Sequence, residues 1–149
     1  MESIPAAVRI HDSSLSRGSL PGKLPSERLA APHVLLVDDD EGLRQAVARG
    51  LAKAGYRVSV AADGREALER VREERPDAAV LDVLLPDSGG LGLAAEMRRI
   101  PGLGALPVLF VTALAPSAVG DTLFPSPVLF KPFSYRQLVA GVRTLLRGR

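Results

Sequence analysis

Ala78-Ala79-Val80-Leu81-Asp82-Val83-Leu84-Leu85-Pro86 is an apolar run that carries one ionisable side chain and ends in a Leu-Leu-Pro turn. The first five residues have the length and composition of a buried strand, with Asp82 at its carboxyl end. In open parallel α/β sheets, ligands bind outside the carboxyl ends of the strands. Asp82 is therefore a candidate for chemistry, although acidic residues also end strands as loop starters or helix caps. The rest of the chain decides between these two interpretations.

The composition bounds the class of protein. The chain has 149 residues, which suits one domain of ordinary size. Hydrophobic residues make up 46%, but only four Phe, two Tyr and no Trp are present, so we expect an aliphatic core. The 19 basic and 17 acidic residues leave a formal net charge of +2, a balance too even to favour direct DNA binding. The absence of cysteine excludes disulfides, thiolate metal sites and a cysteine nucleophile.

The amino-terminal segment, residues 1–32, is rich in Ser, Pro, Gly and Arg and has neither helical nor strand periodicity. It predicts a flexible tail before a domain at residues 33–149, with a short docking segment for a partner as the alternative. Its start does not resemble a secretory signal, and no apolar stretch reaches the roughly 20 residues that span a bilayer. We therefore expect a cytoplasmic protein without membrane contact.

Short apolar runs alternate with segments of helical periodicity from His33 onward. The runs predict strands at residues 34–37, 56–60, 78–82, 107–111 and 128–130. Helical spacing predicts helices over about 43–54, 63–71, 93–100 and 134–146. The helix starts at Asp63 with Glu66, and at Ser134 with Gln137, have capping-box spacing. This order predicts an α/β fold, a doubly wound five-stranded parallel sheet with helices on both faces.

Polar side chains stand at the carboxyl ends of four predicted strands. Asp38 and Asp39 follow the first strand, Asp82 ends the third, Thr112 ends the fourth and Lys131 follows the fifth. Each has an ordinary structural explanation, as a helix cap, a strand end or a solvated cation. Because the carboxyl ends of parallel strands meet at one edge of a sheet, we expect these side chains to converge.

This set of groups suits phosphoryl transfer. Converging carboxylates repel one another by roughly 4 kcal/mol per pair at about 4 Å in an effective dielectric near 20, so a cation is needed. Hard oxygen ligands favour Mg²⁺. A carboxylate such as Asp82 can be the nucleophile and form an aspartyl phosphate. The metal, the Lys131 ammonium and the Thr112 hydroxyl would then neutralise and orient the phosphoryl oxygens.

These motifs resemble the receiver domain of bacterial two-component response regulators over about residues 33–147. They are Val37-Asp38-Asp39-Asp40, Leu81-Asp82-Val83-Leu84-Leu85-Pro86-Asp87 with Gly89-Gly90, Val111-Thr112-Ala113, and Lys131-Pro132-Phe133. The resemblance implies a flavodoxin-like fold with strand order 2-1-3-4-5. It also implies a cis bond between Lys131 and Pro132, a form that essentially only an X-Pro bond adopts.

The resemblance further implies roles for six residues of the motifs. Asp82 would accept a phosphoryl group from a phosphohistidine on a sensor histidine kinase or a histidine phosphotransfer protein. Asp39 and the backbone carbonyl of Leu84 would bind Mg²⁺ together with Asp82, and Asp38 would hold a metal-bound water. Thr112 and Lys131 would contact the phosphoryl group.

Two features depart from the family pattern on the signalling side. Eighteen residues separate Thr112 from Lys131, fewer than in most of the family, so the fourth helix should be shortened or replaced by a loop. Val128 stands where members that switch conformation usually carry Tyr or Phe. The familiar movement of an aromatic ring toward the Thr hydroxyl is therefore not expected in that form.

The leading hypothesis is a single-domain receiver that is phosphorylated on Asp82 and signals by binding an unknown downstream protein, as a phosphoacceptor rather than an enzyme. One alternative is a module that keeps the fold but is not phosphorylated. Another is an aspartate-based phosphatase of the haloacid dehalogenase type that uses Asp38-Asp39-Asp40, although Gly42 stands where Thr or Val is expected. Apolar Leu84 and Leu114 beside the site predict slow loss of the phosphoryl group.

Overall fold

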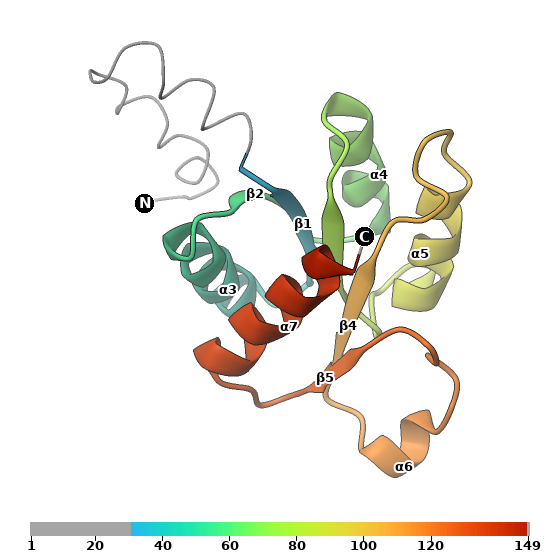
Figure 1. Cartoon of the computed structure of the whole chain (residues 1–149). Helices are drawn as coiled ribbons and strands as arrows, with labels where there is room; N and C mark the ends of the chain where they lie inside the picture. Colours follow the sequence, from blue (N-terminus) through green and yellow to red (C-terminus); the bar gives the residue numbers. More distant parts are fainter. Residues whose placement is uncertain (1–30, 149) are drawn as a thin grey trace.

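The computed structural model describes residues 31–148, and these form a parallel sheet flanked by helices (Figure 1). The elements in chain order are β1 (His33–Val37), α3 (Glu41–Lys53), β2 (Arg57–Ala61), α4 (Gly64–Glu73), β3 (Ala78–Asp82), α5 (Gly89–Arg98), β4 (Val108–Thr112), α6 (Pro116–Val119), β5 (Val128–Phe130) and α7 (Tyr135–Arg147). All five predicted strands are present, each displaced by no more than one residue at either end.

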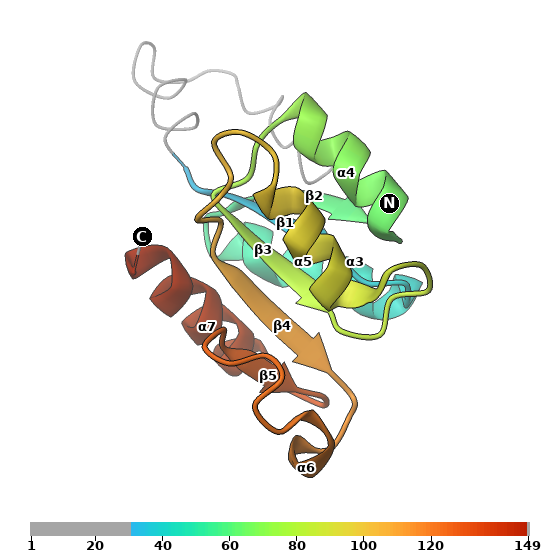
Figure 2. The ribbon, with the colours of Figure 1, turned by 90° about the vertical axis from the view of Figure 1, so that its right-hand side faces the viewer.

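The strand order is β2-β1-β3-β4-β5, and every neighbouring pair is parallel. This confirms the predicted order and the flavodoxin-like fold. Helices α3 and α7 cover one face of the sheet, and α4 and α5 cover the other (Figures 1 and 2). Every residue of β1, β3 and β4 is buried, because helices cover both faces of these strands, and all but the terminal residues His33, Asp82 and Thr112 are apolar.

Alternate strand residues enter two separate apolar clusters. Leu35 and Leu81 pack with the inner faces of α4 and α5, whereas Leu36 and Val80 pack with those of α3 and α7. This alternation follows from the two-residue repeat of side chains along a strand. It fixes which residues face each helix layer and therefore the register of the sheet at its carboxyl edge.

The helix starts match the predicted caps with one correction. Ser134 and Gln137 form a complete capping box at the start of α7. At α4, the Asp63 side chain accepts a hydrogen bond from the backbone of Glu66, but the Glu66 carboxylate accepts from Ala62 rather than from Asp63. The second half of the predicted box is therefore displaced by one residue.

Helix α5 begins earlier than its apolar spacing indicates. It spans Gly89–Arg98, so Gly89 and Gly90, which precede the predicted helix at 93–100, form its first turn, and Ile100 lies beyond its end. Helix α6 has four residues, Pro116–Val119, which confirms the shortened fourth helix. Buried Val119 and Leu123 attach this segment to the cluster on the α4 and α5 side.

His33 is a buried polar residue at the start of β1, with 2% of its surface exposed. Its Nε2 lies 2.7 Å from the Ser59 hydroxyl and its Nδ1 lies 3.2 Å from the carbonyl oxygen of Arg75. The carbonyl can only accept, so Nδ1 carries the proton and Nε2 accepts from Ser59 in the neutral ring. Burial lowers the pKa of His33, against a smaller opposing effect of the Glu74 charge.

Most of the predicted tail, residues 1–30, lies outside the described residues, and the boundary at residue 33 stays a prediction. The carbonyl oxygens of Ala31 and Pro32 accept hydrogen bonds from Arg57, which ties this short piece to β2. Within residues 31–148, none of the helices is long and apolar enough to span a membrane.

Candidate metal and phosphoryl-transfer site

The predicted site residues come from four adjacent strands. Asp38 and Asp39 follow β1, Asp82 ends β3, Thr112 ends β4 and Lys131 follows β5. One carboxylate oxygen from each of Asp38, Asp39 and Asp82 lies within 4.8 Å of the other two. The carboxyl edge of the sheet thus gathers acids that are 44 positions apart in the sequence.

Lys131 joins two of these carboxylates. Its Nζ donates to Asp82 Oδ2 at 2.9 Å and to Asp38 Oδ2 at 3.2 Å. Asp38 and Asp82 are only 1% and 5% exposed, whereas Asp39 is exposed. A buried carboxylate is costly unless it is paired, so the lysine offsets part of the repulsion between the two acids.

The pKa values of two site residues reflect this arrangement. Burial raises the pKa of Asp38, and the neighbouring Asp82 charge acts in the same direction. A hydrogen bond from the Asp40 backbone and the Lys131 charge oppose this rise without cancelling it. Burial by itself would lower the pKa of Lys131, but its hydrogen bond to Asp82 and the two nearby carboxylates raise it overall. The lysine therefore stays cationic beside Asp82.

The backbone around Asp82 is fixed by the loop that follows it. Asp82 Oδ1 accepts from the Leu84 amide at 3.0 Å, and the Gly90 amide donates to the carbonyl oxygen of Val83 at 2.9 Å. A Cβ atom at Gly90 would lie 2.3 Å from the carbonyl oxygen of Asp82. Glycine is therefore required where the first turn of α5 meets the end of β3.

Thr112 lies at the end of β4 and is fully buried. Its hydroxyl oxygen accepts a hydrogen bond from the Leu114 amide at 3.1 Å, and its carbonyl oxygen accepts from the Lys131 amide at 2.8 Å. The second contact fixes Lys131 to the end of the neighbouring strand. The Lys131–Pro132 peptide bond is cis, as the resemblance implies.

Two further residues position the site and were not singled out from the sequence. Arg44 Nη1 donates to the carbonyl oxygen of Asp38 at 2.8 Å, which anchors the acidic loop from inside α3. The Asp87 carboxylate accepts from the backbone amides of Gly64 and Arg65, which ties the loop after Asp82 to the start of α4. Arg44 follows Asp40 by one helical turn, and this spacing indicates that its side chain can reach the acidic loop. No local pattern in the sequence pairs Asp87 with residues more than 20 positions away.

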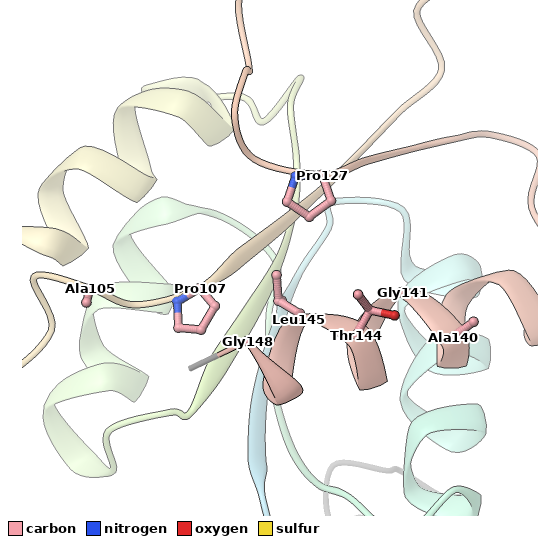
Figure 3. A pocket seen from close by; sticks show the side chains of 8 residues that line it. All are labelled: Ala105, Pro107, Pro127, Ala140, Gly141, Thr144, Leu145 and Gly148. Carbon is pink, nitrogen blue, oxygen red and sulfur yellow. The ribbon is translucent and has the colours of Figure 1, made fainter.

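The edge of the sheet opposite the acids holds a different kind of site. A cavity of about 910 Å³ lies between the carboxyl-terminal half of α7 and the prolines that precede β4 and β5 (Figure 3). Its lining residues are Ala105, Pro107, Pro127, Ala140, Gly141, Thr144, Leu145 and Gly148. None of them is ionisable, so this cavity lacks the groups that the predicted chemistry needs.

Comparison with known proteins agrees with the geometry. Residues 34–143 match the model of the response regulator receiver domain. The chain belongs to this family. As a receiver domain it acts in two-component signalling, and the relatives and solved structures that resemble it are response regulators and CheY-like proteins.

Two curated relatives are named response regulator MprA. The chain is 39% identical over 117 residues to the protein from Mycolicibacterium vanbaalenii and 40% identical over 117 residues to that from Mycobacterium leprae. Each match covers 76% of this chain and 50% of the relative, so the chain spans about half the length of the curated relatives it matches.

Solved structures give the same family. The chemotaxis response regulator CheY4 of Vibrio cholerae matches with a TM-score of 0.70 and 33% identity, over 78% of this chain and 99% of that chain. A putative response regulator from Chloroflexus aurantiacus matches with a TM-score of 0.71 and 36% identity, over 78% of this chain and 98% of that one. Receiver domains bind Mg²⁺ through a cluster of aspartates and are phosphorylated by sensor kinases. Asp38, Asp39 and Asp82 form such a cluster here.

Proposed function

We propose that Asp82 is the phosphoacceptor of this receiver domain and takes its phosphoryl group from a phosphohistidine. The observation that carries the proposal is the position of the Asp82 carboxylate, 2.9 Å from the Lys131 ammonium and within 4.8 Å of two further carboxylates. Of the three clustered acids, Asp82 alone is the last residue of a strand. The Leu84 amide and the Lys131 ammonium both donate to its carboxylate.

The donor set fits a hard divalent cation. Asp39, Asp82 and the carbonyl oxygen of Leu84 would bind Mg²⁺, with Asp38 holding a metal-bound water; all are oxygen ligands of the kind that Mg²⁺ prefers. Three carboxylates face one ammonium, so the cluster keeps excess negative charge that a divalent ion would neutralise. When bound, the ion would draw negative charge from the transferring phosphoryl oxygens.

The transfer step conserves atoms and charge. One carboxylate oxygen of Asp82 bonds to phosphorus as the phosphorus–nitrogen bond of the phosphohistidine breaks, and the released imidazole nitrogen takes up a proton from the solvent. Lys131 stays beside the phosphoryl group and pairs with one of its oxygens. The Thr112 hydroxyl donates to another oxygen, because its own hydrogen is left free by the bond it accepts from Leu114.

The phosphohistidine would belong to a sensor histidine kinase or a histidine phosphotransfer protein in the cytoplasm. The receiver would then act as a phosphoacceptor that binds a downstream protein, not as an enzyme that turns over a separate substrate. The family assignment favours this function over the phosphatase alternative. The cluster of three carboxylates with a lysine at the end of β3 supports this function over a module that is not phosphorylated.

A labelling experiment tests the proposal. Acetyl phosphate with Mg²⁺ should label the wild-type chain and Asp121→Asn, which alters an exposed acid outside the site. Label should be lost in Asp82→Asn and in the wild type with excess EDTA. Undiminished labelling of Asp82→Asn would reject Asp82 as the acceptor. Equal affinity for a downstream partner with and without beryllofluoride would favour the unphosphorylated module.

A further inference from the structure

The cavity of Figure 3 lies where the last strand is too short to cover its neighbour. Strand β4 begins at Val108, whereas β5 pairs with it only from Phe110 onward. The sheet therefore ends in a step beneath the carboxyl-terminal half of α7. Helix α7 lines this step with the small residues Ala140 and Gly141, which leave the space unfilled. We call this space the amino-edge cavity, because it lies where the strands of the sheet begin.

The lining of the amino-edge cavity is uncharged and open to solvent. None of its lining residues is ionisable, and Ala105, Pro127 and Ala140 are exposed. Its volume of about 910 Å³ falls in the range of about 300–1,000 Å³ that is typical of ligand-binding pockets. Open apolar surfaces of this kind mark binding sites. The occupant should therefore be short and apolar.

The described part of the chain begins at the same edge of the sheet. Ala31 and Pro32 precede β1, just as Pro107 precedes β4 and Pro127 precedes β5, and all of these strands are parallel. The first described residues and the end of α7 lie at this edge in both views (Figures 1 and 2). Strand β5 is three positions from β1 in the sheet, a lateral distance of about 15 Å. The preceding segment therefore joins the domain close to the cavity.

Residues 20–25 of that preceding segment read Leu-Pro-Gly-Lys-Leu-Pro. Proline and the residue before it favour extended backbone, so this stretch would lose little conformational entropy on binding. Leu24 is seven residues before Ala31, and seven extended residues span about 23 Å. Leu29 is two residues before Ala31 and can reach only about 7 Å. Leu24 is thus the first leucine before the domain that can reach the cavity.

We propose that residues 20–25 bind in the amino-edge cavity of the same chain. Leu20 and Leu24 would pack on the prolines and Leu145 that line it, and the Lys23 ammonium would stay in solvent. A segment joined to the domain by a short linker meets the cavity at a local concentration in about the millimolar range. Apolar contacts that would be too weak between separate molecules can therefore be occupied.

Other occupants fit these observations less well. A second copy would have to insert one of the large exposed apolar side chains of the described residues, which are Leu84, Leu91, Phe124 and Tyr135. It would do so at its own concentration in solution, whereas residues 20–25 are always attached. A nucleic acid would find no positive charge in the lining. The binding does not depend on phosphorylation, because no cavity residue belongs to the acidic cluster.

A spin label tests the proposal in the whole chain. The chain has no cysteine, so Ser19→Cys provides a single attachment point for a nitroxide. The label should broaden the ¹⁵N amide signals of Thr144 and Leu145. This broadening should be lost in Leu24→Ser and retained in Leu15→Ser, which removes a leucine outside the proposed segment. Broadening that persists in Leu24→Ser would overturn the proposal.

A mixing experiment distinguishes binding within one chain from binding between copies. Labelled chains without ¹⁵N are mixed with ¹⁵N chains that carry no nitroxide. The amide signals at the cavity should stay sharp in this mixture. Broadening as strong as in the singly labelled chain would show that a second copy supplies the segment, and it would overturn the proposal.

A synthetic peptide tests whether the cavity itself is the binding site. A peptide of residues 18–27, added to the Leu24→Ser chain, should shift the amide signals around the cavity. Thr144→Glu adds a carboxylate to the apolar wall and should weaken this binding about tenfold or more. Thr122→Glu changes an exposed threonine outside the cavity and should keep the affinity within about twofold. Equal binding to both glutamate variants would overturn the assignment of the cavity.

Discussion

Replacing Gly90 with alanine tests whether the close approach of α5 to β3 holds the acidic site in place. The added Cβ would lie 2.3 Å from the Asp82 carbonyl oxygen and 3.0 Å from the Asp82 carbonyl carbon and from Val83 Cα. All three contacts are backbone atoms, so no side chain can rotate to relieve them. Either the first turn of α5 or the end of β3 must move.

Two effects of this substitution oppose each other. Alanine favours a helix over glycine by up to about 1 kcal/mol. Inserting a carbon into packed structure costs about 1–3 kcal/mol. Because the contact with the Asp82 carbonyl oxygen is far inside van der Waals distance, we expect the cost to dominate. The free energy of unfolding should fall by about 1–2 kcal/mol, and Asp82 should be phosphorylated more slowly.

Urea denaturation followed by circular dichroism measures the first effect, and labelling by acetyl phosphate measures the second. Gly42→Ala in α3 is the matched control, since its Cβ would meet nothing closer than Asp40 Oδ1 at 3.6 Å. That variant should be as stable as the wild type or more stable by up to about 1 kcal/mol. A Gly90→Ala chain that matches Gly42→Ala in stability and labelling rate would refute the reasoning.

Three other outcomes are expected. Lys131→Met leaves buried Asp38 and Asp82 without their cation, so in EDTA it should lower the free energy of unfolding by about 2–3 kcal/mol. Added Mg²⁺ should stabilise this variant more than it stabilises the wild type. Equal stabilisation of both chains by Mg²⁺, measured in urea titrations, would contradict this. Because the pKa of His33 is lowered in the folded chain, the imidazole of the unfolded chain binds a proton first as the pH falls. The free energy of unfolding should therefore decrease from about pH 7.5 to about pH 5.5, and it should decrease less in His33→Gln. Parallel curves of stability against pH for the two chains would reject this role of His33. Leu84→Ala should shorten the lifetime of the phosphoryl group on Asp82, measured by loss of label. A lifetime of seconds in the wild-type chain would contradict the idea that the leucine side chains shield the phosphoryl group from water.

The strands and the residues at their ends could be predicted from the sequence because both depend on local patterns. Continuous apolar runs indicate strands covered on both faces, and parallel strands bring their carboxyl ends to one edge. These two rules are enough to place Asp38, Asp82 and Lys131 at the same edge of the sheet. The shortened α6 followed from the spacing of 18 residues between Thr112 and Lys131, which is fewer than in most of the family that the motifs resemble.

Contacts between distant residues could not be predicted in the same way. The start of α5 at Gly89 depends on how closely the helix approaches the Asp82 backbone, whereas its apolar spacing begins only at Leu93. The Asp87 bonds to the start of α4 and the amino-edge cavity beside α7 depend on how helices pack on the finished sheet. No short-range pattern in the sequence predicts these contacts between distant residues.

A Mg²⁺ titration observed by ¹⁵N NMR tests most directly whether distant acids form one cation site beside Asp82. We expect the amide signals of Asp39, Asp82, Leu84 and Lys131 to change together, with a single dissociation constant that rises sharply in Asp39→Asn. Signals that respond with different affinities, or that respond equally in Asp39→Asn, would contradict a shared site.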